Sequence, residues 1–312
     1  MPTKISLMNK FFSDLQKEIE AHDLILLFRH VHPDGDALGS QHGLAEWLTI
    51  RYPDKTVLCL GEGEEPVELS DEQLKSALAI ITDTSNAARI DDDRWTKAGK
   101  VARIDHHVKV EDFGDLDYVD DQSSAACQSV AQLLEENGET IGKAAAQNLL
   151  QGLMTDTQKF TISTVSPQTF QTAAWLLEQG ANPLEANRKM FSRTEQDIRF
   201  NALLVSKAIR RGRFIFTVAS RDDYLSRGYR FEQAKNSVNA IGGMEGVEVW
   251  ALFTEQPEGG YSASLRSNTL SVREIAAEFG GGGHVCACGI KGLSDTALMD
   301  VIDALSDLAN NH

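Results

Sequence analysis

The chain has 312 residues, and its 30 Lys and Arg against 46 Asp and Glu give a formal net charge of −16 at pH 7. At roughly 150 residues per domain, this length predicts about two domains, each with its own core. The acidic balance argues against general binding along duplex nucleic acid, which depends on a broad basic surface, so any nucleic acid substrate should be short. The longest apolar runs, 24–28 and 77–81, are too short to span a bilayer, and no membrane association is expected.

The N-terminal segment has the pattern of an amphipathic helix and not of a signal peptide. Its apolar residues recur at steps of three or four: Ile5, Met8, Phe12, Leu15 and Ile19. The four cysteines, Cys59, Cys127, Cys286 and Cys288, lack C-x-x-C or zinc spacing. We therefore expect a cytoplasmic location and reduced, structural cysteines, with Cys286 and Cys288 on the same face of a strand.

From residue 23 to about 105, short apolar runs alternate with helical patterns. Strands are expected at 24–28, 56–60, 78–82 and 101–104, with a helix over 37–48. This rhythm predicts an α/β fold with a parallel sheet flanked by helices. In such sheets ligands collect at the carboxyl ends of the strands, where the segment from His30 to Asp36, then Asp83, and then Asp105 to His107 are found.

The remainder of the chain predicts more helices and then a second unit. Helices are expected over 124–136, 142–156, 167–179 and 194–210, the third with Ser166 as its N-cap. Strands at 213–220, 247–253 and 261–267, with helices near Phe231 and Val272, predict a smaller C-terminal α/β domain across a cleft. The expected boundaries are a catalytic domain over 1–190, a helical linker over 191–212 and a substrate-binding domain over 213–312.

The segment His30-Val-His-Pro-Asp34-Gly-Asp36 contains three metal-type ligands within seven residues. Hard divalent cations prefer carboxylates, and an added imidazole shifts the preference toward manganese or cobalt. The mixed set predicts Mn²⁺, with Mg²⁺ or Co²⁺ as alternatives. For one motif alone, an Asp-Gly-Asp turn in a solvent-exposed loop is the competing interpretation. It loses weight because further Asp and His residues follow two other strands.

Five motifs together resemble the DHH phosphoesterase family. They are HVHPDGDALGS (30–40), ITDTSN (81–86), IDHH (104–107), LMTDT (153–157) and GGGGH (280–284). Their order and spacing match the family over nearly the whole chain. The complete GGGGH and the SLRS at 264–267 are similar to the bacterial group of nanoRNases and 3′-phosphoadenosine 5′-phosphate (pAp) phosphatases, which includes linear-dinucleotide phosphodiesterases.

The resemblance implies a site with two metal ions, bridged by Asp83. One ion would be held by His30, Asp34 and Asp83, and the other by Asp36, Asp83, His106 and Asp156. Asp105 would orient the ring of the adjacent metal-binding histidine, and His107 would meet the substrate phosphate. The C-terminal domain would contact the substrate through Ser264, Arg266, His284 and the backbone of Gly281, Gly282 and Gly283.

Neighbouring residues have simpler interpretations. His22, His32 and His42 are expected at the surface, and Trp47 and Trp175 in the core. Asp91 to Asp93 are expected in a solvated turn or a helix cap.

The function that this implies is hydrolysis of short nucleotide substrates to nucleoside monophosphates by two metal ions. Linear dinucleotides such as pApA, nanoRNA and pAp are the expected substrates, and a cyclic dinucleotide stays open. The alternatives are an inorganic pyrophosphatase, a processive exonuclease of the RecJ type and a non-enzymatic nucleotide sensor. The oligomeric state also stays open, a homodimer included.

Overall fold

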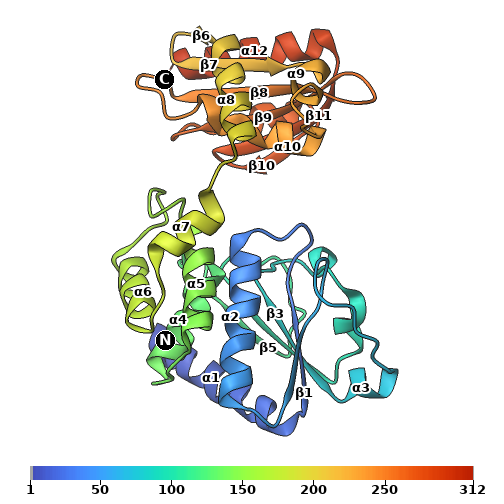
Figure 1. Ribbon diagram of the computed structural model, residues 1–312, viewed down its shortest axis with the longest axis vertical. Coiled ribbons are helices and arrows are strands. Elements are labelled where there is room, and N and C mark those ends of the chain that lie inside the picture. The colour runs from blue at the N-terminus through green and yellow to red at the C-terminus, as the bar shows by residue number, and fades with distance from the viewer. Residues whose placement is uncertain (1–2, 312) are drawn as a thin grey trace. The chain divides into compact units, whose positions relative to one another are not determined.

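The computed structural model describes residues 3–311. The chain divides into two compact units, an N-terminal unit that ends at Ser192 and a C-terminal unit that begins at Arg193. Both are shown in Figure 1. In the described part of the chain, no helix is both long and apolar enough to cross a membrane.

The N-terminal unit is built on a parallel sheet of five strands in the order β2-β1-β3-β4-β5. The strands are β1 (Leu24–Phe28), β2 (Thr56–Cys59), β3 (Ala77–Thr82), β4 (Lys100–Asp105) and β5 (Leu116–Val119). The apolar runs are continuous because both faces are covered. Ile25 and Leu27 pack toward one face, and Leu26 and Phe28 pack toward the other. The predicted parallel sheet is confirmed, although β5 was not foreseen.

Most helices of this unit pack on one face of the sheet (Figure 1). They are α1 (Lys4–Ala21), α2 (Gly35–Arg51), α4 (Ala126–Glu136), α5 (Lys143–Asp156), α6 (Pro167–Glu178) and α7 (Pro183–Phe191). The other face is covered by α3 (Asp71–Lys75) and the short 3₁₀ helices η1 (Ala87–Arg89) and η2 (Asp93–Lys97). Trp47 and Trp175 lie in the core, and Ser166 caps α6, as expected.

Helices α2 and α5 approach each other closely because glycines lie at their crossing. A Cβ on Gly152 would lie 2.2 Å from Sγ of Cys127 and 2.9 Å from the carbonyl oxygen of Gly35. A Cβ on Gly39 would lie 2.6 Å from the carbonyl oxygen of Asn148. The crossing therefore depends on the missing side chains, and it places the start of α2 beside the end of α5.

The C-terminal unit contains a mixed sheet of six strands in the order β10-β11-β9-β8-β7-β6. Only β7 and β8 pair in parallel. The strands are β6 (Ile209–Arg211), β7 (Phe214–Ala219), β8 (Val249–Glu255), β9 (Tyr261–Ser267), β10 (Gly282–His284) and β11 (Ala287–Leu293). One face packs against α8 (Glu195–Lys207), α9 (Arg221–Leu225), α10 (Phe231–Lys235) and η3 (Asn236–Ile241), and the other against α11 (Arg273–Glu278) and α12 (Asp295–Asn310).

Two expectations about this region are wrong. The helix expected over 194–210 ends at Lys207, and Ile209–Arg211 instead form β6, which pairs with β7. Gly212, with φ of +64°, allows the tight turn between these two strands. Cys286 lies in the turn before β11 and is half-buried, while Cys288 is buried on the strand. The two cysteines therefore do not share the face of one strand.

Candidate metal centre

Three adjacent strands, β1, β3 and β4, end at the same edge of the parallel sheet and are followed by acidic and imidazole side chains. His30 comes two residues after β1, Asp83 directly follows β3, and Asp105 is the last residue of β4. The prediction that these strand ends bring the side chains together is confirmed by the geometry. Two groups of potential ligands form here, each with its ligand atoms within 4.8 Å of one another.

The first group consists of His30, Asp34 and Asp83. Nε2 of His30 lies 3.3 Å from Oδ2 of Asp83 and 3.9 Å from Oδ1 of Asp34. Nδ1 of His30 lies 2.8 Å from the carbonyl oxygen of Val31. A ring that donates through Nδ1 to this carbonyl presents an unprotonated Nε2 to a metal, which is the usual arrangement of a ligating histidine.

The second group consists of Asp36, His106 and Asp156. Nε2 of His106 lies 3.7 Å from Oδ2 of Asp36 and 3.3 Å from Oδ2 of Asp156. It also lies 3.4 Å from Oδ1 of Asp83. The two oxygens of Asp83 thus face different groups, Oδ2 toward His30 and Oδ1 toward His106. This is the placement that a bridging carboxylate requires.

The electrostatics of the cluster fit cations. Oδ1 of Asp83 is buried and accepts no hydrogen bond from any residue in 3–311, which is costly unless a cation lies beside it. Burial, followed by the charge of Asp36, raises the pKa of Asp156. Burial acts to lower the pKa of His106, but the surrounding carboxylates, led by Asp83, raise it. Four carboxylates and two imidazoles therefore converge with too little positive charge, and divalent ions would supply it.

Asp36 has a structural role in addition to its place in the second group. Its side chain is fully buried, and its two oxygens accept hydrogen bonds from the backbone N–H groups of Ala126 (2.6 Å) and Cys127 (2.9 Å) at the start of α4. Asp34 is the N-cap of α2 and accepts from the N–H groups of Asp36 and Ala37. The side chain of Asp34 remains 57% exposed, so it lies at the rim of the cluster.

The expectation for Asp105 needs correction. Oδ1 of Asp105 lies 2.8 Å from Nδ1 of His107, and it also accepts the backbone N–H of His106. Asp105 therefore orients the ring of His107 and not the ring of His106. Nδ1 of His106 instead lies 3.2 Å from the carbonyl oxygen of Ser123, a partner that no sequence pattern identified. The ring of His107 is one-third exposed, with Nδ1 3.6 Å from Oδ1 of Asp83.

The residues expected to contact the substrate lie in the C-terminal unit on three adjacent strands. Arg266 on β9 and His284 on β10 both pair with Ala287 of β11. The Arg266 guanidinium donates to the carbonyl of Leu265 (2.8 Å), and it forms no ion pair with any described carboxylate. Ser264 donates its hydroxyl to the carbonyl of Lys235, so that proton is already engaged.

The glycines before His284 differ in what they require. Gly283 has φ of +143°, and a Cβ there would lie 2.4 Å from the carbonyl oxygen of Ala287. At Gly281 a Cβ would lie 2.3 Å from the carbonyl oxygen of Gly289, whereas at Gly282 it would meet open space. Pairing with β11 thus explains two of these three glycines.

Several supporting residues were missed from the sequence. Arg29 is fully buried and pairs with Asp91 (2.7 Å), so Asp91 is a structural partner and not part of a solvated turn. Asp92 does cap η2, as expected. Gln41, also buried, donates to the carbonyls of Leu27 (2.8 Å) and Leu60 (3.0 Å) and ties α2 to the ends of two strands. A polar residue inside an apolar helical pattern was the available signal for Gln41.

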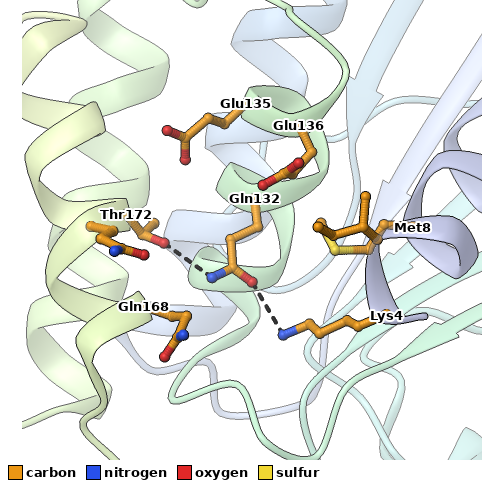
Figure 2. A pocket seen from close by; sticks show the side chains of 9 residues that line it. Lys4, Met8, Gln132, Glu135, Glu136, Gln168 and Thr172 are labelled. Carbon is orange, nitrogen blue, oxygen red and sulfur yellow. Dashed lines mark hydrogen bonds between the residues drawn. The ribbon is translucent and has the colours of Figure 1, made fainter.

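A surface hollow of about 480 Å³ lies between α1, α4 and α6 (Figure 2). Gln132 spans it, donating to Oγ1 of Thr172 (3.3 Å) and accepting from Nζ of Lys4 (3.5 Å). Its lining contains none of the His and Asp residues described above. The cluster at the strand ends is therefore the better candidate for chemistry.

Comparison with known proteins agrees with this geometry. Residues 24–155 match the model of the DHH family N-terminal domain, and residues 215–311 match the DHHA1 domain. An exopolyphosphatase-related protein from Bacteroides fragilis has a similar solved structure, with a TM-score of 0.84 and 25% identity over 96% of each chain.

Curated relatives extend over almost the full length. The probable bifunctional oligoribonuclease and PAP phosphatase NrnA of Streptococcus mutans is 32% identical over 307 residues, which cover 95% of this chain and 98% of that protein. The bifunctional oligoribonuclease and PAP phosphatase NrnA of Bacillus subtilis is 28% identical, covering 96% and 99%. Because both domain models match in order and the relatives align from end to end, this chain belongs to the DHH family and carries a DHHA1 domain after its DHH domain.

Proposed function

We propose that this protein is a Mn²⁺-dependent phosphoesterase that hydrolyses short nucleotide substrates, both linear dinucleotides such as pApA and the mononucleotide pAp. The observation that carries the proposal is Asp83, whose two buried oxygens face two separate ligand groups. The names of the S. mutans and B. subtilis relatives, which combine oligoribonuclease and PAP phosphatase activities, support the choice of substrates.

The ligand set supports manganese. Each group combines one imidazole with carboxylates, and this mixture suits manganese better than magnesium or calcium. One ion would be held by His30, Asp34 and Asp83, and the second by Asp36, Asp83, His106 and Asp156. Ions bound there would lower the pKa of a water and neutralise charge that develops on the phosphate.

His107 is the residue that we assign to the substrate phosphate. Its Nδ1 is engaged by Asp105, and with Nδ1 protonated, Nε2 is a basic nitrogen that can accept a proton. In the protonated ring, Nε2 donates a hydrogen bond to a phosphate oxygen or a proton to the departing 3′-oxygen. The Asp105 carboxylate stabilises that protonated form, so Asp105 acts as a positioning residue.

In the C-terminal unit we assign Arg266 to a substrate phosphate, and His284 with the backbone of Gly281–Gly283 to the terminal nucleotide. The unpaired Arg266 guanidinium and the shared row of Arg266, Ala287 and His284 support this assignment. Ser264 would contribute less than predicted from the sequence, because its hydroxyl already donates to Lys235. Anchoring one nucleotide converts its binding energy into positioning of the scissile bond.

The test is a substrate panel with Mn²⁺: pApA, pAp, oligoribonucleotides of increasing length, a linear and a cyclic dinucleotide of other bases, and pyrophosphate. We expect kcat/KM to be highest for pApA and pAp and to fall beyond a few nucleotides, because the acidic surface attracts longer strands poorly. Turnover of pyrophosphate alone would favour a pyrophosphatase. Absence of turnover on every nucleotide would refute the proposal.

A further inference from the structure

Two valines directly after His107 are unusually exposed. Among the large apolar side chains that the structure describes, Val108 (71%) and Val110 (64%) have the highest exposed fractions. They alternate with Lys109, whose ammonium group pairs with Asp117 (3.1 Å). The segment thus turns its charged side chain back onto the protein and leaves its apolar side chains uncovered.

This exposure does not come from a loose loop, because the following residues are tied down. The buried Arg103 donates to the carbonyl oxygen of Glu111 (3.1 Å) and lies over the ring of Phe113 at 4.3 Å. The Glu111 carboxylate also accepts the backbone N–H of Ala87. The valines therefore stand on a fixed segment at a cost in exposed apolar surface that the fold does not explain.

The position of the segment relates it to the metal centre. It begins at His107, which Asp105 holds, and it ends at Glu111, which is bonded four residues after Asp83. At the reach of an extended chain, the Cα atoms of Val108 and Val110 lie within about 4 Å and 11 Å of the Cα of His107. The valines are consequently at the rim of the cluster, on the side of the proposed phosphate-binding ring.

The chemistry of the pair limits what it can contact. Valine side chains offer no hydrogen bond or charge, so they gain nothing from phosphate and favour the apolar face of a base or a ribose. A dinucleotide has a second nucleoside beyond the scissile phosphate, whereas pAp has none there. We propose that Val108 and Val110 contact this second nucleoside and so set the preference for dinucleotides over mononucleotides. The inference rests on the proposed function.

The experiment compares kcat/KM for pApA and pAp in the full-length protein loaded with Mn²⁺, for wild type and for the double variant Val108→Thr with Val110→Thr. Threonine keeps the shape but replaces a methyl group by a hydroxyl. Ile50→Thr is the matched control, because Ile50 is 61% exposed but lies 14 residues from Asp36 along α2, about 21 Å away.

We expect kcat/KM of the double variant to fall about tenfold for pApA, from about fourfold per lost apolar contact, and to stay within about twofold for pAp. Mn²⁺ binding and the control should match wild type. An unchanged ratio of the two substrates, whether both rates stay the same or both fall together, would overturn this inference alone. A wild-type protein that cleaves neither substrate would overturn the proposed function, and the inference with it.

Discussion

The double role of Asp36 makes a prediction about stability that separates it from the other ligands. Asp36→Ala removes the acceptor for two buried backbone N–H groups, those of Ala126 and Cys127. Hydrogen bonds to a charged group contribute about 1.5–3 kcal/mol each. Part of this gain is offset in the wild type, because burial and the nearby Asp83 disfavour the Asp36 carboxylate and raise its pKa. We therefore expect a net loss of about 2–4 kcal/mol in the free energy of unfolding without metal.

Asp156→Ala is the control. Asp156 accepts no hydrogen bond in the described part of the chain, and its side chain is 26% exposed. Its loss also relieves repulsion with neighbouring carboxylates, so stability without metal should change by less than about 1 kcal/mol. Both variants should bind Mn²⁺ poorly, because each removes a ligand from the second group.

The assay is urea unfolding in EDTA, followed by tryptophan fluorescence, since Trp47, Trp95 and Trp175 all lie in the N-terminal unit. For a slope of about 2 kcal/mol per molar urea, Asp36→Ala should unfold about 1–2 M earlier than wild type, with Asp156→Ala close to wild type. Equal midpoints for the two variants would refute the reasoning, because the bonds to α4 would then contribute nothing measurable.

Three further outcomes are expected. Asp83→Ala should abolish turnover of every substrate and remove both ions in a Mn²⁺ titration, whereas retention of even about a tenth of kcat would argue against a bridging role. Gly152→Ala should lower stability by about 1–3 kcal/mol and reduce kcat, because the new Cβ would meet Cys127 Sγ at 2.2 Å and displace Asp36; wild-type kcat and Mn²⁺ affinity would contradict this. Arg266→Ala should leave bound Mn²⁺ unchanged and reduce kcat/KM for pApA and pAp by more than tenfold, with a smaller loss for a small artificial phosphodiester that lacks a second nucleotide. An equal loss for the small ester would contradict the assigned role.

The parallel sheet and the convergence of the site were predictable because both depend on local patterns. Each strand is a short apolar run, and the carboxyl ends of adjacent parallel strands share an edge of the sheet. The residues after three such runs, among them His30, Asp83 and Asp105, are therefore close in space wherever they lie in the sequence.

Contacts that depend on packing between distant segments were not predictable. Asp36 and Ala126 are 90 residues apart, and no pattern in either segment indicates that a carboxylate of α2 accepts from the start of α4. The partner of Asp105 depends on which of two adjacent rings turns toward it. That choice is made by Ser123, whose carbonyl lies beside the ring of His106. A single sequence carries no signal for such a choice.

The backbone at Asp83 shows how the fold serves the site. Asp83 has φ of +53°, in the left-handed region that costs a residue with a Cβ about 1–2 kcal/mol. Its N–H donates to the carbonyl of Ile104 (3.0 Å), so the turn directly continues the pairing of β3 with β4. Glycine would relieve the strain at this position but would supply no carboxylate. An aspartate that is strained, buried and lacks a hydrogen bond to one oxygen has no account in the stability of the fold, and binding cations through both oxygens explains all three features together.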